Sequence, residues 1–288
     1  PWECREHPAA RCGDEPGIVG GPLESVVVLT QPQWGAYYHM VIDSLTRIVW
    51  IHKQYPQLLQ DEATTFHTGW VAKAGQQWAQ LLGIRTAEGA GNRLLDGWWK
   101  ARVAYFPPGN GCANSNRGVE PDALLGMRRK VLWQLRSVPQ LAAEPPPGGP
   151  VALIVHRDAR RGGGRAVLNH DAVVAAMQQI LTGWSVQEFT DYPEVPDVQT
   201  TCSLFHSASI VVGPHGAGFA NLICVRIVTP LVEFQQDDHA HDYELLSKKL
   251  GMPYIGVRTG LRHADDAEVD VTSVKIALRR ALHMVRGQ

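Results

Sequence analysis

The chain has 288 residues, of which 44% are hydrophobic and 19% charged, a composition typical of globular proteins and unlike that of disordered or fibrous ones. Its 27 basic and 28 acidic residues nearly balance and form no long basic run, so we expect no nucleic-acid partner. The longest apolar runs are the length of a strand, far below the ~18 residues of a membrane helix. The chain begins at Pro1, and we expect a trimmed or processed form that meets a membrane only through an anchor preceding it.

Five cysteines are too few for a disulfide scaffold, and none forms a CxxC pair, which argues against structural zinc and thioredoxin-like chemistry. Cys4 and Cys12 flank a proline-rich segment and would be able to close a small loop in an oxidising compartment. Cys202 and Cys224 lie in apolar stretches, so we predict that both are buried free thiols. The position of Cys112 gives no further indication.

The first half of the chain begins with a polar arm, residues 1–24, followed by short strands and helices. Apolar residues recur at helical spacing after the first β-branched run, with Val41, Ile42 and Leu45 on one side. Turn-forming residues without periodicity predict a loop over Pro107–Gly118. The predicted elements are a strand at Val26–Thr30 and helices at Tyr37–Tyr55, Ala74–Leu82 and Pro121–Leu135.

The second half alternates regularly between strands and helices after a linker, Glu144–Pro150, whose prolines and glycines can continue neither element. Such alternation predicts right-handed βαβ units and a parallel sheet. We expect an arm (1–24), an α/β domain (25–147), a second α/β domain (148–262) and a C-terminal helix (263–288). The predicted strands are Val151–His156, Ser185–Phe189, Ser209–Gly213, Leu231–Phe234 and Tyr254–Val257; the helices are Asp171–Leu181 (capped by Asn169 or Asp171), Val198–Ser207, Ala217–Cys224, Tyr243–Leu250 and Val271–Val285.

A glycine-rich turn provides the strongest local signal. The strand before Gly213 is followed at once by the sequence GPHGAG and the start of a helix. Glycines allow close approach of a ligand, and N–H groups at a helix start suit phosphate or pyrophosphate. The alternative is that these glycines only serve a tight strand-to-helix turn. The spacing is not GxGxxG, so the NAD fingerprint is absent.

An arginine loop, residues 157–169, follows the first strand of the second half. It carries Arg157, Arg160, Arg161 and Arg165 around three glycines. Ligands of open α/β sheets bind beyond the carboxyl ends of strands, where this loop and the glycine turn both lie. Arginine forks suit diphosphate oxygens. The alternative is a solvated basic loop, and we expect Arg160 and Arg161 to be the solvent-facing members.

Two further clusters each allow a functional and a structural interpretation. His39, Asp43 and Arg47 recur every four residues, so they line one helical face as either a general base with its partner or an ordinary ion-pair stripe. The segment Asp237–Asp242 (DDHAHD) is either a metal site or a solvated polar loop. Glu233 ends a strand, where its carboxylate would be able to hold ribose hydroxyls or simply lie at the surface.

Taken together, four segments resemble glycosyltransferase family 61: YYHMVIDSLTR (37–47), Arg157 with RAVLN (165–169), IVVGPHGAGFAN (210–221) and LVEF (231–234). The family includes plant β-1,2-xylosyltransferase, grass xylan arabinosyl- and xylosyltransferases, and O-GlcNAc-transferases acting on EGF domains and O-mannosyl glycans. The resemblance implies a GT-B fold with two Rossmann-like α/β domains facing a cleft and a C-terminal helix closing back. It implies an inverting transfer of xylose, arabinose or GlcNAc from a UDP-sugar to a glycan or glycoprotein, with no metal or cofactor required, in the Golgi or ER lumen.

The same resemblance assigns roles to residues in both halves. In the second half, donor-binding residues would be Arg157, Arg165, Asn169, His215, Gly216, Ala217, Gly218, Asn221 and Glu233. In the first half, Asp43 is the expected general base and His39 the second candidate.

This chain departs from the family pattern at several positions, which leaves the acceptor class open: Met40, Thr46, His170 and Phe219–Ala220 replace the usual Trp, Pro, Glu and Leu-Thr. Two other functions remain as alternatives. One is an inactive GT-B module that binds partners in a larger assembly, and the other is a nucleotide-dependent metalloenzyme using Asp237–Asp242. Composition and motifs give no indication of the oligomeric state.

Overall fold

A computed structural model gives the architecture. It describes residues 20–30, 36–68, 73–84, 94–95, 99–107, 119–136, 149–161, 164–190, 192, 194–236, 241–260, 262 and 265–287. The chain forms two compact units, residues 1–131 and 132–288. Most of the predicted arm and linker, the loop after Pro107, and Cys4, Cys12 and Cys112 lie outside the described residues. No helix in the described part is both long and apolar enough to cross a membrane.

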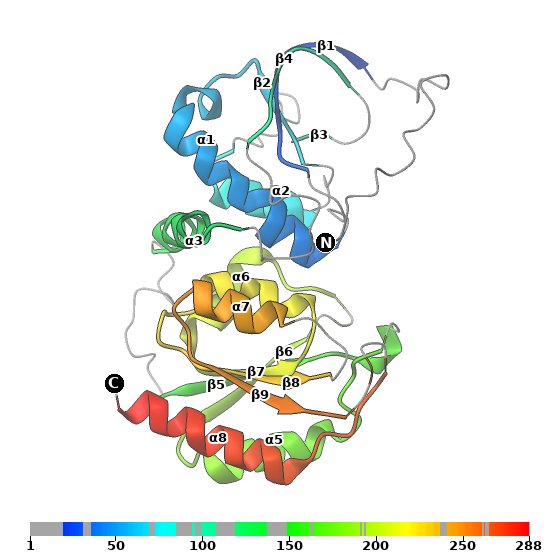
Figure 1. Ribbon diagram of the computed structural model, residues 1–288, viewed down its shortest axis with the longest axis vertical. Helices are drawn as coiled ribbons and strands as arrows, with labels where there is room; N and C mark the ends of the chain where they lie inside the picture. Colours follow the sequence, from blue (N-terminus) through cyan, green and yellow to red (C-terminus); the bar gives the residue numbers. More distant parts are fainter. Residues whose placement is uncertain are drawn as a thin grey trace. The chain divides into compact units, whose positions relative to one another are not determined.

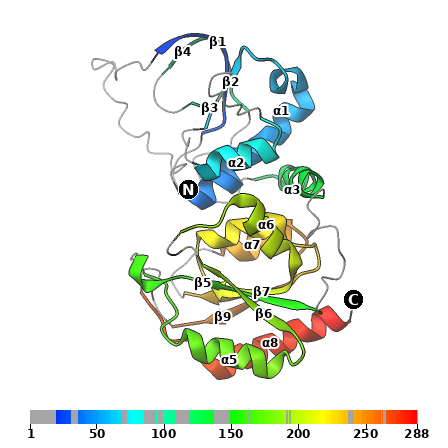
Figure 2. The same cartoon turned by 180° about the vertical axis from the view of Figure 1, so that it is seen from behind.

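The first unit contains a parallel sheet of four strands in the order β3-β2-β1-β4 (Figures 1 and 2). Its core includes Val27 of β1 and Phe66 of β2, which are neighbours in the register and fully buried. The strands are β1 (Gly20–Val28), β2 (Thr64–His67), β3 (Leu94–Leu95) and β4 (Trp99–Tyr105). The helices are η1 (His39–Ser44), η2 (Leu45–Arg47), α1 (Ile48–Gln54), η3 (Pro56–Leu59), α2 (Lys73–Leu81) and most of α3 (Pro121–Leu135), whose last four residues belong to the second unit.

The segment predicted as one helix, Tyr37–Tyr55, is helical over most of its length, but the type of helix changes along it. Residues His39–Ser44 form a π-helix, in which the N–H of Leu45 donates to the carbonyl of Met40, five residues earlier. A short 3₁₀ turn and then α1 follow. The wider π turn still places the apolar residues Ile42, Leu45 and Ile48 in the core, where all three are at most 1% exposed.

The second unit contains a five-stranded parallel sheet in the order β6-β5-β7-β8-β9. Helices α5 and α8 cover one face, while α6 and α7 lie on the other (Figures 1 and 2). The strands are β5 (Val151–His156), β6 (Ser185–Thr190), β7 (Ala208–Pro214), β8 (Leu231–Gln235) and β9 (Tyr254–Arg258). The helices are η5 (Ala159–Arg161), α5 (His170–Ile180), α6 (Val198–Ser207), η6 (Ala217–Cys224), α7 (Asp242–Lys249) and α8 (Val271–Arg286).

The strand order reverses between β5 and β7, because β6 lies beside β5 on one side and β8 and β9 continue from β7 on the other. In doubly wound sheets, the carboxyl ends of the strands at such a reversal are where ligands bind. The α5/α8 face is packed by Ile154, Val173 and Leu278 among other apolar residues. The C-terminal helix predicted after residue 263 therefore belongs to the core of this unit as α8.

The prediction that Cys202 and Cys224 are free thiols is wrong. Cys202 and Cys224 form a disulfide with a Cα–Cα distance of 5.1 Å, because α6 and η6 pack side by side and bring together residues 22 apart in sequence. Asn169, one of the two predicted caps, occupies the N-cap of α5, but its side chain makes no capping bond. Its side chain instead donates to the carbonyl of Val269 and accepts from the N–H of Val269, so it ties this loop to the segment before α8.

Candidate functional site

The glycine turn and the start of the arginine loop meet at the strand reversal of the second sheet. Arg157 directly follows β5, and His215 and Gly216 directly follow β7. A Cβ on Gly216 would lie 3.2 Å from Nη1 of Arg157, so the absence of a side chain there lets the guanidinium approach the turn. Nε of Arg157 is buried and has no hydrogen-bond partner among the described residues. The turn thus presents a cationic donor group at the position where the fold predicts a ligand.

The other glycines of the turn serve packing. A Cβ on Gly213 would lie 2.8 Å from Cβ of Val155 and 2.9 Å from its carbonyl oxygen, so β5 and β7 approach too closely there for any side chain. A Cβ on Gly218 would lie 3.1 Å from the Val155 side chain. Asn221 is buried, and its amide donates to the carbonyl of Gly218. Gly213, Gly218 and Asn221 therefore each have a structural role in the turn.

His215, Glu233 and Tyr254 form a buried hydrogen-bonded chain across three neighbouring strands. Nδ1 of His215 lies 2.6 Å from Oε1 of Glu233, and the hydroxyl of Tyr254 donates to Oε2 at 2.6 Å. Glu233 is only 2% exposed and has both oxygens engaged by protein groups, so in this structure it faces His215 rather than solvent. Burial, and next the Glu233 charge, raise the pKa of Tyr254, which keeps that hydroxyl protonated and donating.

The ring of His215 is neutral at physiological pH. Burial, followed by the positive charges of Arg165 and Arg157, lowers its pKa from 6.5 to about 3, although Asp242 acts in the opposite direction. Because Nδ1 faces a carboxylate, the neutral ring carries its proton there and Nε2 is the acceptor nitrogen. The ring also contacts the fully buried Tyr243, with 4.7 Å between ring centroids. The site therefore combines two guanidinium cations with an oriented hydrogen-bond acceptor.

Arg165 is held in a conformation that non-glycine residues rarely adopt. Its φ of 72° is the only positive value at a non-glycine residue in the part of the chain that the structure describes. Its N–H donates to the carbonyl of Asp265, and the next N–H, of Ala166, donates to the Asp266 carboxylate. Burial and, to a smaller extent, the like charge of Arg157 lower the pKa of Arg165. Two cations held close together in this way favour an anionic ligand.

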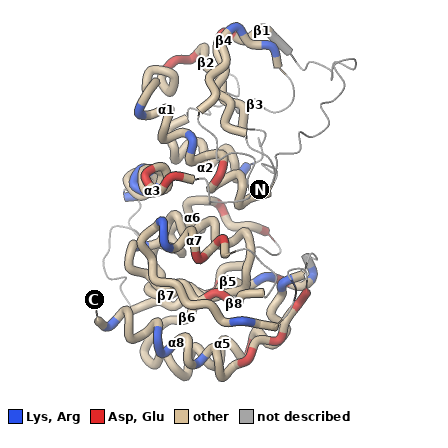
Figure 3. The backbone as a smooth tube through the Cα atoms, in the orientation of Figure 1, with Lys and Arg blue, Asp and Glu red and all other residues tan. Residues whose placement is uncertain are grey.

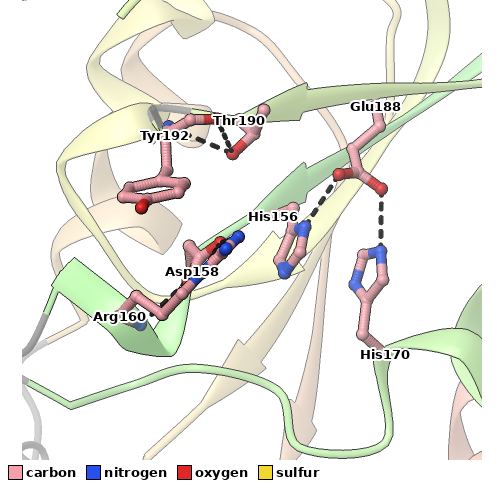
Figure 4. Close-up of polar contacts among 7 residues, drawn as sticks. All are labelled: His156, Asp158, Arg160, His170, Glu188, Thr190 and Tyr192. Atoms are coloured by element: carbon pink, nitrogen blue, oxygen red, sulfur yellow. Dashed lines mark hydrogen bonds and ion pairs between the residues drawn. The ribbon is translucent and has the colours of Figure 1, made fainter. Parts of the chain in front are cut away.

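Arg160 is different, as predicted for a solvent-facing member of the loop. Its side chain is 69% exposed, donates to the Asp158 carboxylate, and lies over the ring of Tyr192 (Figure 4). The hydrogen bonds from Arg160 hold the pKa of Asp158 well below its usual range. Arg160 is thus an exposed member of the loop with a carboxylate partner, which makes it a suitable control for Arg165.

The first unit brings His39 and Asp43 together. Nδ1 of His39 donates to Oδ2 of Asp43 at 2.6 Å, and the carboxylate is 5% exposed. Oδ1 of Asp43 is buried and accepts no hydrogen bond from any described residue. Both residues lie on the π-helix, a turn that occurs frequently at functional sites. The pair has the composition of a general base with an attached orienting group.

Arg47 has a structural role in this unit. It donates to the carbonyls of Thr30, which follows β1, and Pro107, which follows β4. These two strands are adjacent in the sheet, so the buried guanidinium joins their carboxyl ends. Desolvation by burial lowers its pKa to about 10, which leaves it charged at neutral pH. The helical spacing of His39, Asp43 and Arg47 did not indicate this separate role.

The predicted metal segment Asp237–Asp242 lies mostly outside the described residues, and its metal-binding function stays a prediction. Of its members, His241 contacts Glu244 and Asp242 begins α7.

Sequence reasoning missed Tyr243 and Tyr254, both beside the candidate site. Tyr254 is the first residue of β9, which neighbours β8. It pairs in register with Leu231, two residues before Glu233, and side chains two residues apart on a strand share a face of the sheet. This alternation is the signal that would have indicated a contact between Tyr254 and Glu233. Figure 3 shows charges of both signs distributed along both units.

Comparison with known proteins identifies the family. The glycosyltransferase 61 profile matches residues 37–232, about two thirds of the chain, a range that contains His39, Asp43, the arginine loop and the glycine turn. No curated protein matches the sequence. Among solved structures, a glycerate dehydrogenase related protein from Thermoplasma acidophilum is similar at 12% identity, with a TM-score of 0.23, over 90% of this chain and 99% of that one. That similarity is too weak to support a conclusion about fold or function. From the profile match, the chain belongs to glycosyltransferase family 61.

Proposed function

We propose that this glycosyltransferase transfers xylose, arabinose or GlcNAc from a UDP-sugar to a hydroxyl of a glycan or glycoprotein. The proposed reaction inverts the anomeric centre and needs no metal. The observation that carries this proposal is the pairing of Arg157 and Arg165 around the neutral His215 at the strand reversal of the second sheet. Cations fixed there would do the work that a divalent metal does for a leaving diphosphate.

In the proposed donor site, Arg157 and Arg165 neutralise the diphosphate, and the backbone of Gly216, Ala217 and Gly218 supplies further donors. His215 lies beside the sugar or the phosphate of the nucleotide-sugar in this proposal. Glu233 acts as a positioning residue, since its carboxylate holds the ring of His215. Asn169 and Asn221, which the resemblance assigns to donor binding, would support the site by fixing the two loops.

For the acceptor, we propose Asp43 as the general base, with Oδ1 receiving the hydroxyl proton and His39 holding Oδ2. The deprotonated oxygen forms a bond to the anomeric carbon while the bond to the UDP oxygen breaks. The transition state has oxocarbenium character, as in glycosidases. The departing UDP takes the electron pair, and the arginines stabilise its charge.

We further propose a GT-B architecture and a location in the ER or Golgi lumen. Two Rossmann-like parallel sheets support the architecture. The disulfide between Cys202 and Cys224 supports the location, because such bonds persist in oxidising compartments. Membership of family 61 supports both.

Calorimetric titration with UDP and with UDP-xylose, UDP-arabinose and UDP-GlcNAc, each with and without EDTA, tests the donor proposal. We expect binding that EDTA does not weaken and a preference for one sugar. Arg165→Ala should abolish most binding and turnover, whereas Arg160→Ala, in the same loop but exposed and paired with Asp158, should leave both unchanged. Equal effects of the two substitutions would refute the role of Arg165.

The acceptor half is tested separately with Asp43→Asn, which should bind UDP normally but transfer no sugar. Normal transfer by this variant would place the base elsewhere. A protein that binds no nucleotide at all would favour the alternative of an inactive GT-B module, and a search for protein partners would follow.

A further inference from the structure

Three side chains outside the proposed donor site converge at the carboxyl edge of the second sheet. His156 is the last residue of β5, Glu188 lies on β6, and His170 is the first residue of α5. Nδ1 of His156 lies 2.7 Å from Oε1 of Glu188, and Nε2 of His170 lies 2.8 Å from Oε2 (Figure 4). The two imidazole rings stack with 4.0 Å between centroids and 16° between planes.

This His₂Glu cluster has the donor atoms of a transition-metal site. The two nitrogens and a carboxylate oxygen lie within 4.8 Å of one another. Tetrahedral zinc with bonds of about 2.0–2.1 Å requires ligand atoms roughly 3.3 Å apart, a contraction that small side-chain rotations can supply. Two imidazoles with one carboxylate suit zinc and its neighbours in the first transition row, whereas magnesium and calcium prefer oxygen ligands alone.

The cluster is also accessible. The side chains of His156, His170 and Glu188 are 27%, 13% and 41% exposed, so an ion has an entry path and water can complete its coordination.

The position of the cluster differs from that of the proposed donor site. Ala152 and Ile154 of β5 pack in the core beneath α5 and α8, and His156 continues their alternation on that face. Val155 instead meets Gly213 and Gly218. His156 and His170 also stand immediately before and after the segment 157–169, the arginine loop. An ion held by both residues would close this loop at its base.

We propose that His156, His170 and Glu188 bind one divalent transition-metal ion, with zinc the best match, and that the ion clamps the two ends of the arginine loop. This proposal does not depend on the donor assignment, because metal binding is measured without any nucleotide. It concerns a structural ion and leaves the transfer chemistry proposed above metal-independent.

The test is calorimetric titration of the untagged full chain with zinc chloride at about pH 7.5, after EDTA treatment and dialysis. We expect one ion per chain. His170→Gln keeps a donor to Glu188 but removes the imidazole, so it should preserve the fold and weaken binding at least about 100-fold. Glu188→Gln and His156→Gln should weaken binding similarly. His283→Gln, at an exposed position on α8, is the matched control and should bind as the wild type does.

Two further measurements sharpen the test. Magnesium should not compete with zinc for the cluster, because it prefers oxygen ligands alone. Zinc should also raise the midpoint of thermal unfolding of the wild type but not of His170→Gln. Absence of zinc binding would overturn the proposal. Binding that survives all three cluster substitutions would equally overturn it, since the ion would then lie elsewhere, for example at the segment 237–242.

Discussion

Replacing Glu233 with glutamine tests whether this buried carboxylate orients His215. The carboxylate accepts two hydrogen bonds of 2.6 Å, one from His215 and one from Tyr254. Hydrogen bonds to a charged group contribute about 1.5–3 kcal/mol and neutral ones about 0.5–1.5 kcal/mol, so the substitution forfeits roughly 1 kcal/mol at each contact. We expect the free energy of unfolding of Glu233→Gln to fall by about 2 kcal/mol.

The same variant should change the tautomer of His215. A glutamine amide can present either its oxygen or its nitrogen, so the proton of the ring no longer has a fixed place at Nδ1. Urea denaturation measures the loss of stability, and the ¹⁵N chemical shifts of the imidazole report the tautomer. Tyr254→Phe is the control, because it removes one donor to Glu233 and should cost about 1 kcal/mol while leaving the tautomer unchanged. Unchanged stability together with an unchanged tautomer in Glu233→Gln would refute the positioning role.

Three further predictions concern stability. Gly213→Ala should lower the free energy of unfolding by about 1–3 kcal/mol in urea titrations, because the Cβ of the new alanine would lie 2.8 Å from Cβ of Val155. An unchanged urea concentration at the unfolding midpoint would contradict the close approach of β5 and β7. The pKa of His215 is lowered from 6.5, so the unfolded chain binds a proton that the folded one excludes, and stability should fall as pH drops below 6.5. His215→Gln should show a shallower loss between about pH 6.5 and 5, and equal slopes would argue against a buried neutral ring. Cys202→Ser should cost about 3 kcal/mol by opening a loop of 22 residues to Cys224, while thiol labelling of the unfolded, unreduced wild type should leave both cysteines unmodified.

Much of the fold was predictable because the spacing of apolar residues within a segment reflects which of its side chains are buried. The buried run Val151–His156 and the helices Pro121–Leu135 and Val198–Ser207 were predicted with the bounds that the structure gives them. Apolar spacing and flanking prolines or glycines define such elements without reference to the rest of the chain. The same patterns did not reveal that the helix after residue 37 begins as a π-helix, since its apolar residues are buried at either pitch.

The candidate site was predictable in part. The glycine turn and the arginine loop follow strands in sequence, and parallel strands deliver such segments to one edge of a sheet, so Arg157 and Gly216 were expected near each other. The sequence could not separate the glycine that accommodates Arg157 from Gly213, which is required for packing. That distinction depends on how closely β5 and β7 approach, which no local pattern encodes.

The sequence by itself determined the strand-helix alternation, the family resemblance and the segments that carry its polar residues. Only the tertiary structure decided which of those residues touch. Glu233 meets His215 and Tyr254 because β8 lies between β7 and β9, and Cys202 meets Cys224 because α6 packs on η6. His156, His170 and Glu188 converge for the same reason. Contacts between residues far apart in sequence depend on strand order, register and helix packing, and these arise from the summed burial of the whole core rather than from any single segment.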